Sequence, residues 1–365
     1  MSPSPTLTFP ALDVVGADNA VPADAVVASV QRLGVGLLAP AAEAADIDGV
    51  PRSHFDALAN VGALGRAHAA PVQRELAELI AGSCGTTWFC WAQHRTPTEI
   101  IANSDNDELR EQWADDLYRG RALAGVAFAH VRRPGAPAVS ATANSDGWNF
   151  SGSLDWVTSW TIADVVVVVA ETVDGQLVQA VLEPGVQPGV TVTGPLPLAA
   201  MNGTHTWPVR LDDLHVPAAS VAKVEPKAEW LARDALTTVN VSPHIFGVSR
   251  AAIALLAATG EQRKQPAAVE LAEQFADHLR TMRRTAYALI DDEPANEFTA
   301  ERLALRADAL DLAVRTTTAA VAARAGGAMR LSDPAQRYAR EALFYLVQAQ
   351  TADGRAATLR RWTQG

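Results

Sequence analysis

A run of five valines, residues 165–169, lies near the middle of the chain and most constrains what the chain can fold into. Consecutive β-branched residues favour a buried strand. Other strand-like segments, punctuated by Gly and Pro, are residues 148–152, 179–182, 190–192 and 209–211. Because no helix-length periodic segment separates them, the sequence predicts an antiparallel β-barrel or sandwich over residues 122–225, and no doubly wound parallel sheet.

Helical segments flank this central region on both sides. In the first of them, residues 22–24 (Pro-Ala-Asp) suit a first helical turn, because proline is preorganised there and an acid lies near the positive helix end. Four long C-terminal helices are predicted over residues 228–262, 267–290, 299–325 and 334–361. The predicted fold class is α+β, with a helical domain (1–121), a β-domain (122–225) and a C-terminal four-helix bundle (226–365).

Composition and charge exclude several classes of partner. With 48% hydrophobic residues in 365, the chain can bury a sizeable core. A net charge of −11 argues against nucleic acid. Cys84 and Cys90 lack zinc-site spacing, so we expect buried thiols and no metal. The N-terminus lacks the pattern of a signal peptide, and the longest apolar run is far shorter than the roughly 20 residues of a spanning helix, so we expect a cytoplasmic protein.

Five local patterns, in the same order along the chain, resemble those of the acyl-CoA dehydrogenase superfamily. The second of them, Asp-Gly-Trp-Asn-Phe-Ser-Gly-Ser-Leu-Asp-Trp-Val-Thr-Ser, resembles the family's Asp-Gly-x-x-x-x-Asn-Gly-x-Lys-x-Trp-Ile-Thr. The last combines a Gly-Gly loop with an Arg-x-x-Arg-Glu-Ala helix. The five patterns lie at residues 106–121, 146–159, 164–169, 211–217 and 326–342. The resemblance extends from about residue 22 to about residue 362.

This resemblance implies a fold, a cofactor and a type of reaction. The fold is the same order of helical domain, β-domain and four-helix bundle. The cofactor is FAD, with FMN or diffusible reduced flavin left open, and the reaction oxidises the CH–CH bond of an acyl thioester such as an acyl-CoA. The resemblance also implies a homodimer or homotetramer, and the alanine-rich bundle helices favour close contact between copies.

The resemblance also assigns flavin-binding residues. The family's Trp-Ile-Thr, which lies against the flavin ring, falls on Trp156 and Thr158, followed by Ser159. A core tryptophan in a β-domain is the alternative. The family residues that contact the FAD diphosphate across a dimer interface, and its Gly-Gly loop, fall on Arg263, Gln274, Gly326 and Gly327. Exposed Arg and Gln are, however, ordinary on a long helix.

The chain departs from the family pattern in one flavin-binding loop. Where the family has Thr-Glu-Pro-Gly, this sequence has Arg132, Arg133, Pro134 and Gly135. Two guanidinium groups at this position could bind a flavin phosphate or a carboxylate substrate, because arginine presents a fixed fork of donors. A solvated loop is an equally good interpretation.

A second departure concerns the catalytic base. The family's glutamate falls on Ala349, and the alternative position used by some relatives falls on Thr237. Neither side chain can accept a proton near neutral pH. His244, His94 and His130 are candidate substitutes, because histidine titrates near neutrality. His94 follows an aromatic run that could line a pocket, although each histidine could equally be an ordinary core or surface residue.

Three functions therefore remain open from the sequence. The first is an acyl-CoA dehydrogenase-like flavoenzyme that lacks the usual glutamate. The second is a reduced-flavin monooxygenase on the same fold, which needs no base for an α-proton. The third is a non-catalytic relative. Fold alone cannot choose among them.

Overall fold

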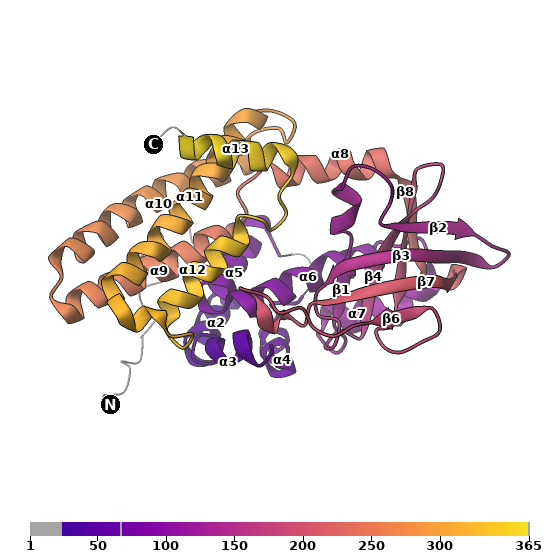
Figure 1. The fold of residues 1–365 in the computed structure, drawn as a ribbon, viewed down its shortest axis with the longest axis horizontal. Helices are drawn as coiled ribbons and strands as arrows, with labels where there is room; N and C mark the ends of the chain where they lie inside the picture. Colours follow the sequence, from indigo (N-terminus) through magenta and orange to yellow (C-terminus); the bar gives the residue numbers. More distant parts are fainter. Residues whose placement is uncertain (1–23, 66–67, 364–365) are drawn as a thin grey trace.

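The structure, a computed structural model, describes residues 24–65 and 68–363. Figure 1 shows the strands at one end of the molecule, most of the C-terminal helices at the other, and the N-terminal helices between them. The N-terminal helices are α2 (Ala25–Leu33), a π-helical turn (Gly34–Leu38), α3 (Ala42–Ile47), α4 (Arg52–Asn60), α5 (Ala70–Ser83), α6 (Gly85–Ala102) and α7 (Asp107–Tyr118). Asp24 caps α2 by accepting hydrogen bonds from two backbone N–H groups, whereas residues 22 and 23 lie outside the described residues.

One mixed sheet of eight strands forms the central region. Its strands are β1 (Ala124–Ala127), β2 (Val139–Ala143), β3 (Gly147–Val157), β4 (Val165–Glu171), β5 (Gln176–Leu182), β6 (Val190–Val192), β7 (Trp207–Pro217) and β8 (Val221–Pro226). The order is β6-β7-β3-β2-β4-β5-β8, and β1 also pairs with β4. The predicted fold class is confirmed, and the five predicted strands are present as β3 to β7.

The pairing of β4 differs from a purely antiparallel arrangement. β1 pairs parallel with residues 165–168, and β2 pairs parallel with Glu171, so the two short strands follow one another along the same edge of β4. The chain between them leaves the sheet as a loop with a short 3₁₀ helix (Ala129–Arg132). Parallel partners of this kind are set by tertiary contacts, which the sequence pattern of a single strand does not carry.

The valine run in β4 is buried on both faces of the sheet. Val166 and Val168 belong to the core on one face, together with side chains from β3, β5 and β7. Val165 and Val167 pack on the other face with Ile101 of α6 and with apolar residues of α7. Burial on both sides explains why this strand is a continuous run of valines and not an alternating pattern.

The C-terminal region contains more helices than the sequence predicted. They are α8 (Lys227–Thr238), α9 (Pro243–Arg263), α10 (Pro266–Asp292), α11 (Thr299–Arg324), α12 (Pro334–Tyr345) and α13 (Ala352–Thr363). The predicted helix 228–262 is therefore two helices, since Pro243 begins a new one, and the predicted helix 334–361 is also two. The break after α12 matters most, because it contains Ala349 in a left-handed conformation (φ 50°).

Helix α9 is the core helix of the molecule and packs closely against α5. A Cβ atom on Gly247 would lie 2.4 Å from the carbonyl oxygen of Glu78, so only glycine allows this approach. By length and composition, residues 227–263 could also cross a membrane, but 72% of the apolar window is buried inside the protein. Its apolar surface is thus used by internal packing.

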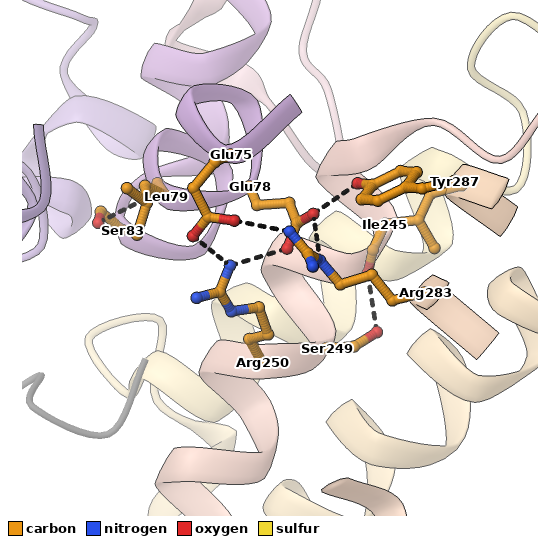
Figure 2. A network of polar contacts seen from close by, with 9 residues as sticks. All are labelled: Glu75, Glu78, Leu79, Ser83, Ile245, Ser249, Arg250, Arg283 and Tyr287. Carbon is orange, nitrogen blue, oxygen red and sulfur yellow. Dashed lines mark hydrogen bonds and ion pairs between the residues drawn. The ribbon is translucent and has the colours of Figure 1, made fainter. Parts of the chain in front are cut away.

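A buried ionic network joins α5, α9 and α10 (Figure 2). Glu75 and Glu78 of α5 face Arg250 of α9 and Arg283 of α10, with nitrogen–oxygen distances between 2.7 and 2.9 Å. Tyr287 donates a further hydrogen bond to Glu78. All five side chains are buried, and two carboxylates balance two guanidinium groups. The network therefore connects one N-terminal helix, α5, to two helices of the bundle.

Candidate functional site

A cavity of about 610 Å³, cavity A, lies between the sheet and the turn that follows α12. The sheet side contributes side chains at the ends of β1 and β3, and α6 contributes Phe89 and Gln93. The opposite side is formed by the last turn of α12 and the residues after it. The lining from this second side is Arg340, Leu343, Phe344, Val347, Gln348 and Ala349.

Two of the three residues predicted to face a flavin ring line cavity A. The indole of Trp156 is 52% exposed, so its ring is accessible to a ligand in cavity A. Thr158 is buried beside it. Ser159 is absent from the lining: it has a left-handed conformation (φ 65°), and its N–H donates to the carbonyl of Thr204 at 3.0 Å. Ser159 therefore ends the strand and fixes the turn.

Three threonine hydroxyls form a chain beneath this wall. Thr204 donates to the carbonyl of Met201 at 2.7 Å, and the hydroxyls of Thr204, Thr206 and Thr158 follow one another at 2.8 and 3.0 Å. Because each hydroxyl has one proton, Thr206 then donates to Thr204, and Thr158 donates to Thr206. Thr158 is left with lone pairs that can accept a hydrogen bond from a ligand in cavity A.

Ala349 also lines cavity A, as expected for the position of the family's base. Its side chain is a methyl group. Among the described residues that line cavity A, none is an aspartate or a glutamate. The two arginines in the lining are both paired, Arg340 with Asp46 at 2.7 Å and Arg132 with Asp234. Cavity A therefore offers no carboxylate to take a proton.

A larger cavity of about 830 Å³, cavity B, lies between α6 and the start of α9. His244 lines cavity B, and Gln348 lines both cavities. The aromatic run on α6 lines pockets as predicted: Trp88 and Trp91 face cavity B, and Phe89 faces cavity A.

His244, a predicted catalytic residue, is held between aromatic rings. Its imidazole stacks on Trp88 with 3.9 Å between centroids, and the edge contact to Tyr345 is 4.4 Å. Burial, and then the charge of Arg306, hold the pKa of His244 well below its usual value. Its Nε2 atom has no hydrogen-bond partner among the described residues. His244 is thus a neutral imidazole with an unused polar atom, and a weak base.

The other predicted catalytic histidine, His94, has a different role. Its Nε2 atom contacts the carbonyl of Leu117 at 3.2 Å, and its Nδ1 atom accepts from the N–H of Ala124 at 3.0 Å. It lines neither cavity. Both ring nitrogens are used to join α6, α7 and β1, so His94 is a core residue. His130, which contacts the carbonyl of Val169 at 2.8 Å, is likewise bonded to backbone.

The buried state of His94 predicts a loss of stability in acid. Burial lowers its pKa from 6.5 to about 4, so the unfolded chain binds the proton more readily than the folded chain. Stability present above pH 6.5 is therefore lost as the pH falls toward 4, and His94 alone should cost about 2 kcal/mol at pH 5. We expect urea unfolding of His94→Gln, whose amide can replace both hydrogen bonds, to depend less on pH. An equal dependence in both proteins would contradict this.

The two loop arginines are already paired within the chain. Arg132 donates two hydrogen bonds to Asp234, at 2.7 and 2.6 Å, and lies over the rings of Phe128 and Trp230. Arg132 lines cavity A, but its charge is neutralised. Arg133 pairs with Asp155 at 2.7 Å on the surface and lines neither cavity. Neither arginine is therefore free for the predicted substrate contact.

The predicted diphosphate-binding residues lie on the outside of the bundle. Arg263 donates to the carbonyls of Ala323 and Arg324, and Arg324 precedes Gly326 by two residues, so Arg263 lies near the predicted Gly-Gly loop. Gln274 is exposed on α10 and contacts Glu270 at 3.3 Å. None of the four lines cavity A or cavity B.

Sequence reasoning missed two buried polar residues that contact the cavity lining. Arg306 is buried and donates to the carbonyl of Asn240, the hydroxyl of Ser242 and the carbonyl of Gln348. Burial lowers its pKa to about 10. Tyr345 packs against His244, and its hydroxyl has no partner among the described residues. No local pattern distinguishes these side chains from ordinary helix residues, since only the packing of α8 to α12 brings them together.

Glu341, in the Arg-x-x-Arg-Glu-Ala pattern, is a buried carboxyl group to which the sequence assigned no role. It lies 3.1 Å from Arg337, and burial raises its pKa to about 7. A Cβ atom on Gly85 would lie 2.6 Å from its carboxyl carbon, so α6 and α12 are in close contact here. Glu341 lines neither cavity, which makes it part of the helix packing and not of the site.

The sequence and the fold of this chain were compared with those of known proteins. No protein-family model matches the chain. The probable acyl-CoA dehydrogenase YngJ of Bacillus subtilis (strain 168) is 24% identical over 198 residues, which is 52% of each protein, so the chain spans about half the length of this curated relative. Butyryl-CoA dehydrogenase from Megasphaera elsdenii is 18% identical, with a TM-score of 0.72 over 93% of this chain and 97% of that one. A glutaryl-CoA dehydrogenase from Mycobacterium smegmatis, solved with FADH2, is 16% identical, with a TM-score of 0.75 over 97% and 98%.

Proposed function

We propose that this chain, which has the acyl-CoA dehydrogenase fold, is a flavin-dependent oxidoreductase that binds FAD and acts slowly on the CH–CH bond of an acyl thioester. The observation that carries the proposal is cavity A. Its sheet side presents Trp156 and Thr158, which match the family's flavin-facing residues, and its helical side presents Ala349 where the family has its base. Fold and cavity together support a flavin oxidoreductase.

The residues of cavity A fit a flat, partly polar ring system. The exposed indole of Trp156 provides an apolar wall, and the hydroxyl of Thr158 provides an acceptor for a ring N–H group. The volume of about 610 Å³ lies within the range of small-molecule sites. FAD, when bound there, would supply the hydride acceptor. The chain itself would orient the ring and exclude water from the side that faces Phe344 and Val347.

The expected weakness of the reaction follows from the missing carboxylate. Loss of a general base typically lowers a rate by about 10²–10⁴-fold. His244 cannot replace it efficiently, because its pKa is well below the usual value and its ring lines cavity B. We propose that the Nε2 atom of His244 forms a hydrogen bond with a neutral group of the substrate. In that role it positions the substrate.

The first test of the function is flavin binding. We expect the purified protein to be yellow or to bind added FAD, because cavity A offers both an aromatic wall and a polar contact. Replacing Trp156 with Ala should weaken FAD binding at least tenfold, measured by fluorescence titration of the flavin. Leu359→Ala, which removes an exposed apolar side chain from α13, is the control. A protein that binds no flavin under any condition would exclude the proposal.

The second test is anaerobic reduction of the bound flavin by butyryl-CoA. Slow bleaching supports a dehydrogenase-type reaction with an impaired base. Rapid bleaching would mean that another group serves as the base. If the protein instead consumes oxygen only when separately reduced flavin is supplied with an aromatic or amine substrate, the monooxygenase interpretation is correct.

We also propose that the chain forms a homodimer or homotetramer. Two large apolar side chains just before α12, Met329 and Leu331, are exposed and line neither cavity. Contact with a second copy would cover such a surface. In a dimer, Arg263 and Gln274 would be available to a diphosphate group of the partner's cofactor. Light scattering at micromolar concentration should report at least a dimer, and a monomer would contradict the proposal.

A further inference from the structure

Cavity B has an unusual balance of charge for this chain. The chain has a net charge of −11, yet the lining of cavity B contains four cationic side chains and only two carboxylates. The cations are Arg74, Arg95, Lys223 and Arg233. The local excess of positive charge favours an anionic ligand over a cationic one.

Three of these four cations already have a carboxylate partner. Arg74 makes a two-point contact with Asp291, at 2.8 and 2.6 Å. Lys223 and Arg233 both pair with Glu225, at 2.9 and 2.5 Å. The Arg74 pair is neutral, whereas Lys223 and Arg233 share one carboxylate and keep one positive charge between them, on side chains that are about half exposed.

Arg95 is the exception. Within residues 24–65 and 68–363 its guanidinium group makes no hydrogen bond and no ion pair, and its contact is with the ring of Trp91, whose centroid lies 5.3 Å away. Glu99, one helical turn further along α6, attracts the charge without reaching ion-pair distance, and its carboxylate instead accepts from Asn103. Burial lowers the pKa of Arg95, but a guanidinium group remains charged near neutral pH. A partly buried charge without a partner is costly, and an anionic ligand would remove that cost.

The surroundings of Arg95 specify the kind of anion. A single planar guanidinium group, held against an indole, presents one fork of parallel donors, which matches the two oxygens of a carboxylate. A phosphate group carries up to two charges and three acceptor oxygens, more than the single donor fork of Arg95 can satisfy. The rest of the lining includes Trp88, Ile100, Val241 and Ile290, so the body of the ligand is apolar.

We propose that cavity B binds a carboxylic acid with an apolar body, with Arg95 as the partner of the carboxylate. The inference rests on the proposed function in one respect: it makes the acid the non-reacting end of the substrate. The apolar body then extends from Arg95 toward Gln348, which lines both cavities, so that the reacting end enters cavity A. His244 lies along this path.

Calorimetry with a matched pair of probes tests the proposal. The probes are 3-phenylpropionate and its uncharged amide, 3-phenylpropionamide, titrated into the flavin-free protein. We expect the acid to bind at least tenfold more tightly than the amide. Arg95→Gln should remove this preference by weakening only the acid, whereas Arg133→Gln, which changes an exposed arginine outside both cavities, should keep it.

Several outcomes would overturn the proposal. Equal binding of acid and amide to the wild type would do so, as would an acid preference that persists in Arg95→Gln. Binding of free coenzyme A that depends on Arg95, without binding of the acid, would identify a phosphate partner instead. Thermal unfolding tests whether Arg95→Gln is folded. If this variant is unfolded, tryptophan fluorescence of the wild type replaces it as the test. Quenching by the acid but not by the amide supports the proposal, and equal quenching by both contradicts it.

The same measurements separate this proposal from the proposed function. Binding is measured without flavin, so a protein that binds the acid and fails to bind FAD retains the anion site and loses the oxidoreductase function. A protein that binds FAD and shows no preference for the acid retains the basis of the oxidoreductase function and lacks the anion site.

Discussion

Replacing Ala349 with Glu is expected to speed the anaerobic bleaching of bound flavin by butyryl-CoA by about 10²–10⁴-fold over the wild type. Ala349 lines the same cavity as Trp156 and Thr158, and no aspartate or glutamate among the described residues does so. A carboxylate at this position would supply the missing base. The backbone tolerates the change, because Ala349 already has a positive φ of 50° and glutamate adds no branch at Cβ. Stopped-flow absorbance of the flavin measures the rate.

The matched control is Ala349→Gln, which has nearly the same size and shape but cannot accept the proton as a base. We expect it to bleach no faster than the wild type, while FAD content is equal in all three proteins. If Ala349→Glu is no faster than Ala349→Gln, cavity A does not hold the thioester at this position. A wild type as fast as Ala349→Glu would instead point to another base, and His244→Gln would then be the next variant to measure.

Replacing Glu78 with Gln is expected to lower the free energy of unfolding by about 3–5 kcal/mol. Glu78 is fully buried and accepts from Arg250, Arg283 and Tyr287 (Figure 2). Without its charge, two buried guanidinium groups share the single carboxylate of Glu75. Removing one partner of a buried ion pair costs more than the pair contributes, because the remaining charge stays desolvated. Urea unfolding measures the change.

Two comparisons make the Glu78 result specific. Glu273→Gln, on the exposed face of α10, should change the free energy of unfolding by less than about 0.5 kcal/mol. The double variant Glu78→Met with Arg283→Met should lose less than the sum of the two single changes, since it removes both members of a pair. A Glu78→Gln protein as stable as the Glu273→Gln control would show that the network adds little to the docking of α5 on the bundle.

Much of the fold could be predicted from the sequence, because the signals are local. The valine run and the Gly/Pro punctuation identify strands by residue type alone, and β3 to β7 lie where they were expected. The missed strands are β1, β2 and β8, which have four to six residues each. They are strands because β4, β3 and β5, respectively, provide pairing partners. Likewise, the break between α8 and α9 depends on Pro243 and on Arg306, which binds the connecting segment from α11.

The candidate site was predictable only in part. Trp156, Thr158 and Ala349 were found through motif order, and all three line cavity A. The chemistry of histidine predicts a catalytic role for His94, but the structure uses both of its ring nitrogens for backbone contacts. The charge of Arg132 predicts a contact with an anionic group, but this charge is neutralised by Asp234, which lies 102 residues further along the chain.

The sequence by itself determined the order of the helical region, the β region and the second helical region, because helix periodicity and β-branched composition act over a few neighbouring residues. Only the tertiary structure decided which polar side chains are free. A histidine or arginine has the same sequence signature whether a distant carbonyl or carboxylate satisfies it or not, and the partner is specified by packing. For this reason no motif singled out Arg95. Among the cations that line cavity B, it is the one without a carboxylate partner in the described part of the chain.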